Sequence, residues 1–509
     1  MIYGFSPFGS SGHVVRVEVD VRRGLPGTDI VGLPSSEVRE CRERVRVAIR
    51  NSGLVYPTDR ILVSLSPAEI PKVGAGFDLP IALAILYQTG QIHLPDSLLA
   101  AGEVSIRGTL LPTRGILSAI IAAGEAHIPA VLLPRRALGA IAGLGQVIET
   151  LFAMESLEEA VRGYPEAVDP PEIPRSLQMG EPSMDDVAGQ DHAKRAAMIS
   201  TAGFHNIMFM GPPGSGKTMT ARRMIDIMPP LTRHDALEVA RIHSLRGLER
   251  PGLVTTPPVR MPHHSVSQEG MLGGGRNLLP GEISLAHRGI LVLDEATEFQ
   301  PRVLQALREP VEERYVSISR AGQIEQFPTS FILALTTNLC PCGGLGQPGK
   351  LCLCSVQEIA RYWRRVGAAL MDRVDIRVVT VPQFYRTPAP SPVSHPPVAS
   401  ATADQMRSQV RIAIERQTHR GAQRRWKRNG LVPPGMVESL LPVPQPLVTL
   451  IQELMKEHGL SDRAAHSVRA VARTIADLAD RETVGETDIR EAVALRVIGA
   501  DSLLGRGEA

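Results

Sequence analysis

A phosphate-binding loop motif in the middle of the chain constrains its fold more than any other feature. Residues 211–218 read GPPGSGKT and fit the pattern G-x-x-x-x-G-K-[ST]. Glycines let such a loop fold into a nest of backbone N–H groups that face phosphate oxygens. Lys217 adds a positive charge toward the β- and γ-phosphates, and Thr218 offers its hydroxyl to Mg²⁺. The motif therefore predicts a site for ATP and Mg²⁺.

The residues around this loop support the same interpretation. The apolar run His205–Met210 predicts a buried strand, and Lys217 to about Ile227 predicts a helix whose positive end faces the phosphates. A chance glycine loop is the alternative, and it does not explain the strand before the loop or the helix after it. The predicted nucleotide-binding residues are Gly211, Pro212, Pro213, Gly214, Ser215, Gly216, Lys217, Thr218 and Met219.

Two carboxylates follow a second apolar strand. The run Ile290–Leu293 ends directly in Asp294 and Glu295, and in open α/β folds ligands bind at the carboxyl ends of the strands. We expect Asp294 to hold Mg²⁺, directly or through water. We expect Glu295 to polarise the attacking water as a general base. The alternative is a pair of capping residues at the start of the next helix.

A third apolar run, Phe331–Leu335, leads into Thr336, Thr337 and Asn338. A polar tip on a neighbouring strand can orient the water that attacks the phosphate. Asn338 is therefore the candidate for sensing the γ-phosphate. Strands that alternate with helices from about residue 184 to 382 predict a parallel sheet.

Two proline-rich stretches divide the chain into three parts, which we place at 1–163, 184–382 and 403–509, with linkers at 164–183 and 383–402. The first linker contains Pro165, Pro170, Pro171, Pro174 and Pro182. In the first part, runs at Val14–Val21 and Arg60–Leu65 predict strands, and Ser36–Asn51 and Leu79–Tyr87 predict helices. In the last part, Val468, Val471, Ile475 and Leu478 recur at helical spacing and predict one buried helix face.

Composition excludes several classes of protein. Lys and Arg number 55 against 53 Asp and Glu, so any contact with nucleic acid must come from a local patch. No apolar run approaches the roughly 20 residues that span a bilayer, and the first residues lack the features of a signal peptide. Five cysteines among 509 residues are too few for a disulfide scaffold. We therefore expect a cytoplasmic protein without membrane contact.

Four of the five cysteines fall close together, at Cys340, Cys342, Cys352 and Cys354. Four thiolates suit one tetrahedral Zn²⁺, and the glycines between the pairs allow a tight loop. The spacing C-x-C is rarer than C-x₂-C, and free thiols or adventitious disulfides are the alternative. We predict a closed, structural zinc site that stiffens the loop after Asn338.

The order of these motifs resembles that of AAA+ ATPases. The segments MDDVAGQDHAKRAA, GGGRNLLPGEISLAHRGILVLDEATEF, VSISRAG, TTNLCPCG and RTIADL together resemble the ComM/YifB family, whose members are magnesium-chelatase-like AAA+ proteins. The resemblance covers residues 3 to about 500. It implies a homohexameric ring that acts on single-stranded or branched DNA as a branch-migration helicase.

The resemblance also implies roles for two arginines. Arg373 matches the arginine finger that enters the neighbouring subunit's ATP site, where a guanidinium stabilises charge on the transferring phosphoryl group. A local salt bridge to Asp372 or Asp375 is the alternative. Arg463 resembles the second sensor on the lid, and Arg469 is the second candidate for that role.

The first part of the chain resembles the proteolytic domain of Lon. The position of Lon's nucleophilic serine falls on Gly76 and that of its lysine on Ala119, so the Ser–Lys dyad is absent. The expected fold class is thus α/β overall. It comprises an N-terminal Lon-like (ribosomal S5-like) α+β domain, a central P-loop AAA+ three-layer α/β domain and a C-terminal helical lid.

Four segments of the sequence are candidates for contact with DNA. A strand at Tyr315–Ser319, flanked by Arg314 and Arg320, resembles the family's pore hairpin, and an ordinary edge hairpin is the alternative. The glycine-rich insertion at Met261–Gly275, expected to be mobile, resembles a second pore element. Two basic helical segments are further candidates, with a solvated helix face as the alternative for each. Their cations are Arg39, Arg42, Arg44, Arg46 and Arg50 in one and Arg420, Arg424, Arg425, Lys427 and Arg428, beside Trp426, in the other.

Three functional classes are compatible with this sequence. The leading one is a ring-forming DNA translocase. The others are a motor subunit of a magnesium-chelatase-like complex and an ATP-dependent protein remodeller. The Lon-like domain is taken as an argument against the chelatase alternative, because the chelatase motor resembles only the central and C-terminal parts.

Overall fold

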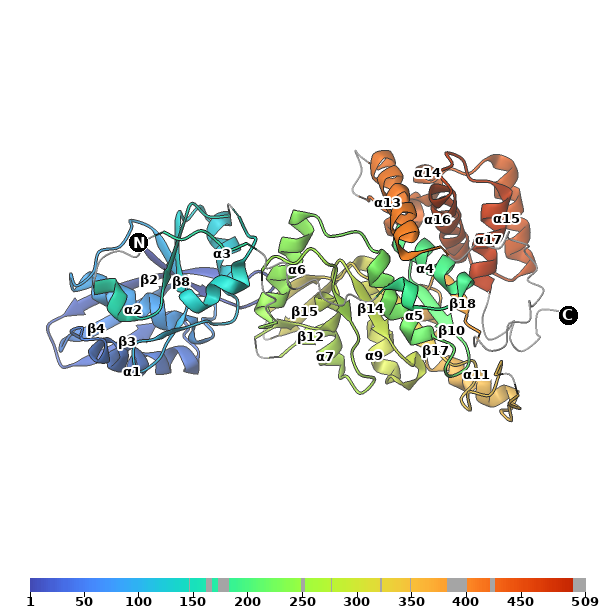
Figure 1. Cartoon of the computed structure of the whole chain (residues 1–509). Coiled ribbons are helices and arrows are strands. Elements are labelled where there is room, and N and C mark those ends of the chain that lie inside the picture. Colours follow the sequence, from blue (N-terminus) through green and yellow to red (C-terminus); the bar gives the residue numbers. More distant parts are fainter. Residues whose placement is uncertain are drawn as a thin grey trace.

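The computed structural model describes residues 1–145, 147–161, 167–172, 183–248, 252–275, 277–320, 323–347, 349–381, 401–421 and 426–497. Three parts follow one another along an elongated molecule, with the N-terminal domain at one end, the sheet that carries the phosphate loop in the middle and the helical lid at the other end (Figure 1). In the described ranges, none of the helices is both long and apolar enough to cross a membrane.

The N-terminal domain is built on a mixed sheet of seven strands in the order β3-β4-β2-β1-β5-β8-β9. Its strands are β1 (Ile2–Ser6), β2 (His13–Arg22), β3 (Gly27–Val31), β4 (Arg60–Ser66), β5 (Leu98–Ala100), β8 (Ala130–Pro134) and β9 (Thr150–Met154). A separate hairpin pairs β6 (Glu103–Val104) with β7 (Leu110–Leu111). The helices are α1 (Ser36–Asn51), α2 (Asp78–Gln88) and α3 (Ile116–Glu125).

The alternation of side chains along each strand places helices on both faces of this sheet. Leu98 packs in one apolar cluster with α1 and α2, and its neighbour Leu99 packs in another cluster with α3. The α+β domain expected from the sequence is thus confirmed. The two expected helices and two expected strands appear within one or two residues of their predicted bounds.

The middle part contains a five-stranded sheet in the order β11-β14-β17-β10-β18, and every pair in it is parallel. The strands are β11 (Val259–Arg260), β14 (Ile290–Leu293), β17 (Ile332–Thr337), β10 (Ile207–Met210) and β18 (Ile376–Val379). The surrounding helices are α4 (Asp191–Gly203), α5 (Lys217–Arg223), α6 (Arg233–Leu245), α7 (Gln268–Leu272), α8 (Glu282–Leu285), α9 (Pro301–Ala306), α10 (Arg308–Glu313), α11 (Val356–Arg364) and α12 (Ala368–Met371).

The period-2 pattern of these strands builds three layers. Ile207 faces a cluster with α4, while the next residue, Met208, faces a second cluster with α9 and α11. The predicted three-layer arrangement is therefore confirmed. The predicted helix after the phosphate loop differs in its last turn: α5 ends at Arg223, and Met224–Ile227 is a 3-10 helix that ends shortly before Pro229 and Pro230.

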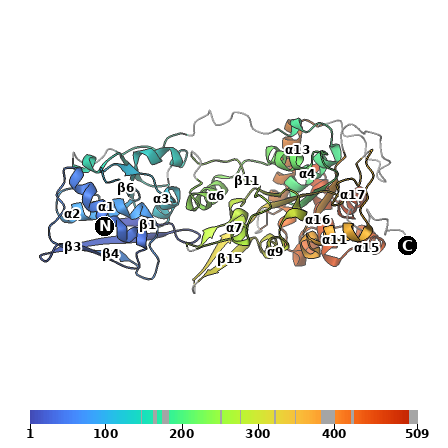
Figure 2. The same ribbon diagram turned by 90° about the horizontal axis from the view of Figure 1, so that it is seen from below.

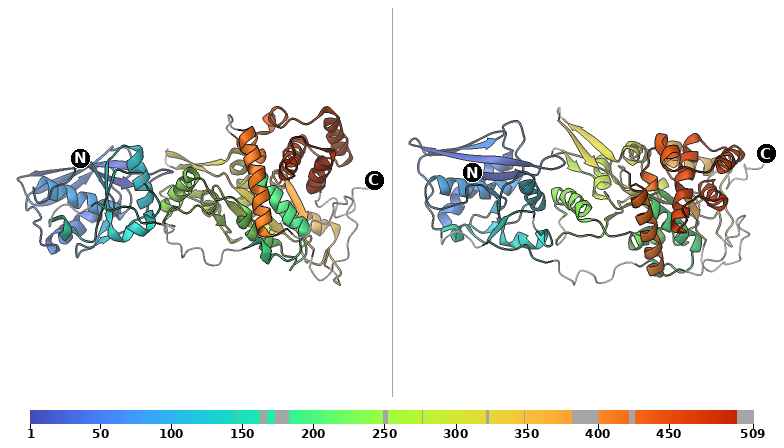
Figure 3. Two further views of the ribbon diagram at one scale, coloured as in Figure 1. Left: turned by 45° about the horizontal axis from the view of Figure 1, so that its top comes forward. Right: turned by 90° about the horizontal axis from the view of Figure 1, so that it is seen from above.

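Two small antiparallel hairpins project from this part. One pairs β12 (Gly273–Gly274) with β13 (Leu279–Pro280), and the other pairs β15 (Tyr315–Arg320) with β16 (Gln323–Pro328). The β15–β16 hairpin lies beside the N-terminal domain (Figures 2 and 3). There Glu325 accepts hydrogen bonds at 3.0 Å from both the amide and the hydroxyl of Ser10.

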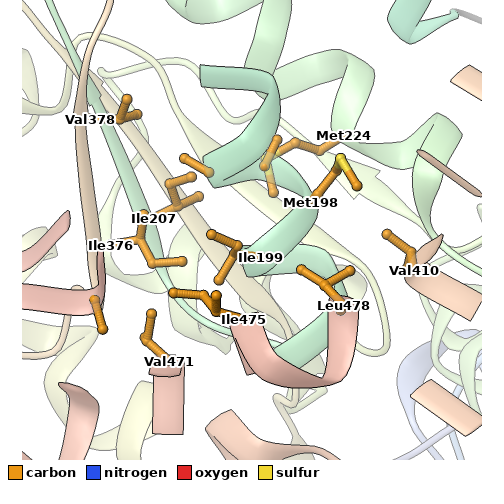
Figure 4. Close-up of a cluster of buried hydrophobic side chains, with 14 of the residues drawn as sticks. Met198, Ile199, Ile207, Met224, Ile376, Val378, Val410, Val471, Ile475 and Leu478 are labelled. Carbon is orange, nitrogen blue, oxygen red and sulfur yellow. The ribbon is translucent and has the colours of Figure 1, made fainter. Parts of the chain in front are cut away.

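The lid consists of α13 (Ala403–Arg420), α14 (Val437–Leu440), α15 (Gln445–Glu457), α16 (Asp462–Leu478) and α17 (Glu486–Val497). The expected apolar face of α16 is buried: Val471, Ile475 and Leu478 pack beside Ile199 of α4 and Ile207 of β10 (Figure 4). Lid and sheet thus share one hydrophobic core. Within the linkers, Pro165, Pro174, Pro182 and most of 383–402 lie outside the described residues.

Candidate nucleotide-binding site

The phosphate loop joins the end of β10 to the start of α5 at the carboxyl edge of the sheet. Gly214 and Gly216 take φ values of 76° and 83°, which favour glycine and curve the loop. The Ser215 hydroxyl lies 2.6 Å from the hydroxyl of Thr380, which follows the neighbouring strand β18. Gln190, at the start of α4, donates from Nε2 to the Ser215 carbonyl at 3.1 Å. These contacts fix the phosphate loop from the side of β18 and from the side of α4.

Lys217 lies at the centre of this loop. Its Nζ donates to the carbonyls of Gly211 and Pro212, both at 2.8 Å, and to Oδ1 of Asn338 at 3.1 Å. Burial lowers the pKa of Lys217, and the nearby carboxylates of Asp294 and Glu295 oppose that shift. The ammonium group is therefore held by weak neutral acceptors, which phosphate oxygens can replace.

Asp294 follows β14 and receives two hydroxyl groups. Thr218 and Thr336 each donate to its Oδ1 at 2.6 Å. Thr336 also accepts the Glu295 amide at 3.0 Å. A carboxylate and a hydroxyl within hydrogen-bond distance are the hard oxygen ligands that Mg²⁺ prefers, so Thr218 and Asp294 fit the ion predicted between them.

The remaining predicted residues occupy the rim of the same site. Glu295 is exposed and has a φ of 52°, an uncommon conformation for a residue other than glycine. Met219, on the first turn of α5, is 38% exposed and free to meet a ligand. The structure thus brings Lys217, Thr218 and Asp294 together with Asn338, as the motif order predicted.

Sequence reasoning missed three supporting side chains. Gln190 and Thr380 carry no motif of their own, and Thr336 was considered only as part of a polar strand tip. The alternation of β17 could have singled out Thr336, since it shares a face with Ala334 and Ile332 and therefore points away from Thr337.

The four cysteines lie together, as the spacing predicted. Their sulfur atoms are all within 4.8 Å of one another. Three of the separations are 3.4 Å (Cys340 to Cys342), 3.5 Å (Cys340 to Cys352) and 3.7 Å (Cys342 to Cys352). A tetrahedron with bonds of about 2.3 Å has sulfur–sulfur edges of roughly 3.8 Å, so the cluster has nearly the size of a four-thiolate zinc site.

Backbone groups support the thiolates and the phosphate loop at once. The amide of Gly344 donates to Sγ of Cys342 at 3.4 Å, and this bond, together with those from the neighbouring thiols of Cys354 and Cys340, lowers the pKa of Cys342 to about 6. In the same loop, a Cβ atom on Gly343 would lie 2.9 Å from Cγ of Pro213. The cysteine loop therefore packs directly on the phosphate loop. The fifth cysteine, Cys41, is fully buried, and burial raises its pKa to about 12, so it is a core residue.

Arg373, the predicted arginine finger, lies away from the phosphate loop of its own chain. Asn206, immediately before β10, accepts the Asp375 amide on its carbonyl at 3.0 Å and donates to the Arg373 carbonyl at 2.9 Å. Arg373 is therefore at the start of β10, whereas the phosphate loop leaves the end of that strand. The four residues of β10 separate the two by about 13 Å.

Arg463 is found beside Arg373. Both guanidinium groups donate to Glu312, so the alternative salt bridge from Arg373 to Asp372 or Asp375 is not the one that forms. Arg469 instead pairs with Glu438 inside the lid, at 3.2 Å. Of the two lid candidates, Arg463 alone shares the surroundings of Arg373.

Several candidate DNA-binding cations are used inside the protein. Arg44 forms a bidentate pair with the buried carboxylate of Asp78 at 2.9 Å. Arg420 pairs with Asp477, and burial lowers the pKa of Arg428 to about 10.

Arg424 and Arg425 lie outside the described residues. Arg39 and Arg50 remain exposed on α1.

The Met261–Gly275 insertion contains the short helix α7 and the strand β12. Ser267 caps α7 by accepting the Gly270 amide at 3.0 Å. A Cβ on Gly273 would meet the Leu279 carbonyl at 2.6 Å, so this glycine permits close backbone approach. His263 and His264 lie in a loop, with their ring centroids 4.0 Å apart.

Comparison with known proteins covers nearly the whole chain. Three family profiles match it: "Subunit ChlI of Mg-chelatase" at residues 17–137, "Magnesium chelatase, subunit ChlI" at 183–387 and "Magnesium chelatase, subunit ChlI C-terminal" at 400–496. The competence protein ComM of Haemophilus influenzae is 35% identical, covering 98% of this chain and 97% of its own. The uncharacterized protein YifB of Escherichia coli is 34% identical, covering 95% and 94%.

The chain belongs to the ComM/YifB family. This magnesium-chelatase-like AAA+ family suggests an ATPase that uses a nucleotide and Mg²⁺. The N-terminal domain does not exclude the chelatase alternative. The N-terminal part itself matches a profile described for subunit ChlI, so its presence is no argument against a chelatase-like motor.

Proposed function

We propose that this chain is a ring-forming ATPase, hexameric by the family resemblance, that moves along single-stranded or branched DNA and promotes branch migration. The observation that carries the assembly part of the proposal is the position of Arg373, at the opposite edge of the sheet from its own phosphate loop. An arginine finger at that edge can serve only a neighbouring chain's nucleotide. DNA as the substrate is what the resemblance to the ComM/YifB family implies, and the relatives named above are members of that family.

Within one chain, the proposed chemistry uses the residues around the phosphate loop. Lys217 exchanges the carbonyls of Gly211 and Pro212 for phosphate oxygens. Thr218 and Asp294 would hold Mg²⁺, and the bound ion would supply positive charge next to the phosphates. Glu295 accepts the proton of the attacking water, and Asn338 orients that water.

The neighbouring chain completes this site in the proposal. Arg373 stabilises the charge that develops on the γ-phosphoryl group, and Arg463 approaches from the same edge. Hydrolysis then depends on assembly, because no single chain brings both halves together. The cysteine cluster with Zn²⁺ fixes the loop that packs on Pro213.

Two features favour DNA over a protein substrate. The β15–β16 hairpin carries Arg320 at its exposed end, where phosphate groups can be contacted. The first turns of α1 add exposed Arg39 and Arg42 on the N-terminal domain. A magnesium-chelatase-like motor is the second candidate, and the three ChlI profiles are the observation that favours it.

The test is the rate of ATP hydrolysis by the full chain without DNA and with single-stranded DNA, duplex DNA or a four-way junction. Lys217→Ala supplies the blank. We expect stimulation that is greatest with single strands or junctions, followed by branch migration of a labelled junction. A robust rate that no DNA changes would remove the translocase proposal and favour the chelatase-like motor or a protein remodeller.

A further inference from the structure

One carboxylate, that of Glu312 at the end of α10, binds both Arg373, the predicted arginine finger, and Arg463, the predicted second sensor. Arg373 donates from Nη2 to its Oε2, and Arg463 donates from Nη1 to its Oε1 at 2.9 Å. Burial alone would raise the pKa of Glu312, but the two arginine hydrogen bonds outweigh it and the pKa is lowered. The carboxylate therefore stays ionised while it holds two cations.

In this arrangement Arg373 is retracted into its own chain. Its side chain is only 12% exposed. Nη1 donates to the Ala369 carbonyl at 2.7 Å, and Nη2 is held by Glu312. An arginine finger must present these same nitrogen atoms to a neighbour's phosphate. The guanidinium group of Arg373 is thus bonded to partners in its own chain. It must leave Glu312 before it can bind a neighbour's phosphate.

The surroundings carry more arginine than carboxylate. Arg496 donates to Asp372 at 3.1 Å, and Arg463 lies 3.8 Å from the same carboxylate. Arg377 and Asp375 belong to the same group of charges, so four guanidinium groups face three carboxylates here. An additional anion from outside the chain would be attracted to this edge, and the γ-phosphate of a nucleotide bound to a neighbour has that chemistry.

Glu312 is also tied to the β15–β16 hairpin. Only Glu313 and Arg314 separate it from the first residue of β15. Arg314 fixes the base of the hairpin, since its carbonyl accepts the Thr329 amide at 2.8 Å and its Nη1 donates to the Phe331 carbonyl at 3.1 Å. A short, anchored segment therefore joins the Glu312 carboxylate to the hairpin, and a shift at the base of the hairpin would reach the end of α10 through it.

We propose that Glu312 is a positioning residue that holds Arg373 and Arg463 in the idle chain and releases them when the hairpin engages a nucleic-acid strand. This inference rests on the proposed function, because it assumes that Arg373 serves a neighbour's ATP site. It adds a physical connection: when the hairpin binds a nucleic-acid strand, Glu312 releases Arg373, and Arg373 can then enter the neighbouring chain's ATP site.

The experiment compares full-length wild type, Glu312→Gln and the control Glu313→Gln, which changes an exposed neighbour on the same helix. ATP hydrolysis is measured with and without single-stranded DNA over a range of protein concentrations. We expect Glu312→Gln to raise DNA-free hydrolysis about three- to tenfold, the range for one partly exposed charged hydrogen bond. The stimulation by DNA should shrink by the same factor, and Glu313→Gln should match wild type.

A second measurement does not depend on hydrolysis. In a Glu295→Gln background with ATP, sedimentation should show that Glu312→Gln assembles at a lower protein concentration than its parent. Adding Arg373→Ala should abolish the gain in hydrolysis. If Glu312→Gln does not fold, Glu312→Asp, which keeps the charge but shortens the reach, should show a smaller change in the same direction.

The outcomes separate this inference from the proposed function. Equal losses with and without DNA would mean a merely structural role and would overturn the inference, as would an unchanged stimulation ratio. If no DNA stimulates wild type but Glu312→Gln still raises hydrolysis and assembly, the hold on the arginines is upheld and the DNA substrate is wrong. If DNA stimulates wild type but Glu312→Gln behaves like wild type, DNA is upheld as the substrate and the role assigned to Glu312 is wrong.

Discussion

Replacing Thr336 by valine tests the way in which the structure positions Asp294. Valine has nearly the shape of threonine, so the core of β17 stays filled, but the hydroxyl that donates to Asp294 at 2.6 Å is lost. The amide of Glu295 loses its acceptor as well. Once Mg²⁺ takes the Thr218 hydroxyl, Thr336 is the hydroxyl that still orients the carboxylate.

The expected magnitudes follow from these two contacts. A hydrogen bond to a charged group contributes about 1.5–3 kcal/mol to the free energy of unfolding. Thr218 still donates to Asp294 in the variant, so we expect a loss near the lower end of that range. Groups that orient a metal ligand typically change activity by about 10- to 100-fold. We therefore expect ATP turnover to fall by that factor while nucleotide affinity, set mainly by the phosphate loop, changes little.

Steady-state ATP hydrolysis and the binding of a fluorescent ATP analogue measure the two quantities separately. Thr337→Val is the matched control, because Thr337 is equally buried on the same strand but its hydroxyl bonds to Tyr362 at 3.1 Å and to the Asn338 carbonyl at 3.2 Å, and not to Asp294. Its turnover should stay close to wild type. If the two variants lose turnover equally, or if Thr336→Val retains full activity, the role assigned to the Thr336 hydroxyl is refuted.

Three further predictions concern the metal, pH and the N-terminal domain. Purified protein should contain one zinc ion per chain by elemental analysis, and Cys352→Ser should lose it and weaken nucleotide binding. Burial lowers the pKa of His205 to about 4; the unfolded chain therefore takes up a proton below about pH 6.5 that the folded chain does not, and stability should fall by about 2 kcal/mol between pH 7.5 and pH 5. His205→Gln should remove that part of the pH dependence in urea unfolding. Arg44→Gln should cost about 3 kcal/mol in thermal unfolding of the N-terminal domain, since it leaves the Asp78 carboxylate buried without its partner, whereas adding Asp78→Asn should restore most of the loss.

Local patterns predicted much of this fold because several elements are set by short-range signals. Ser36–Asn51 is a helix at both predicted bounds, since Ser35 caps it and its apolar positions recur every three or four residues. The strand predicted at His205–Met210 begins later, at Ile207. Asn206 uses its amide and side chain to bind the starts of β17 and β18, contacts that depend on residues more than 120 positions away.

The candidate site also combines residues that short sequence motifs identify with residues that only the fold brings together. Lys217, Thr218 and Asp294 stand in motifs whose spacing reflects their chemistry, so the sequence alone grouped them. The cysteines were grouped in the same way. Glu312 carries no motif, and its partners Arg373 and Arg463 are 61 and 151 residues away. Only the packed structure shows that one carboxylate joins them.

The shared core of sheet and lid makes the domain count in folding differ from the count along the chain. Ile199 and Ile207 on one side and Val471 and Ile475 on the other belong to a single buried cluster (Figure 4). A fragment that stops before residue 401 would expose this surface and should aggregate, however complete its nucleotide loop. Calorimetry of the full chain should accordingly resolve two cooperative transitions, one for the N-terminal domain and one for sheet and lid together, and any transplant of the ATPase into another protein has to carry its last hundred residues along.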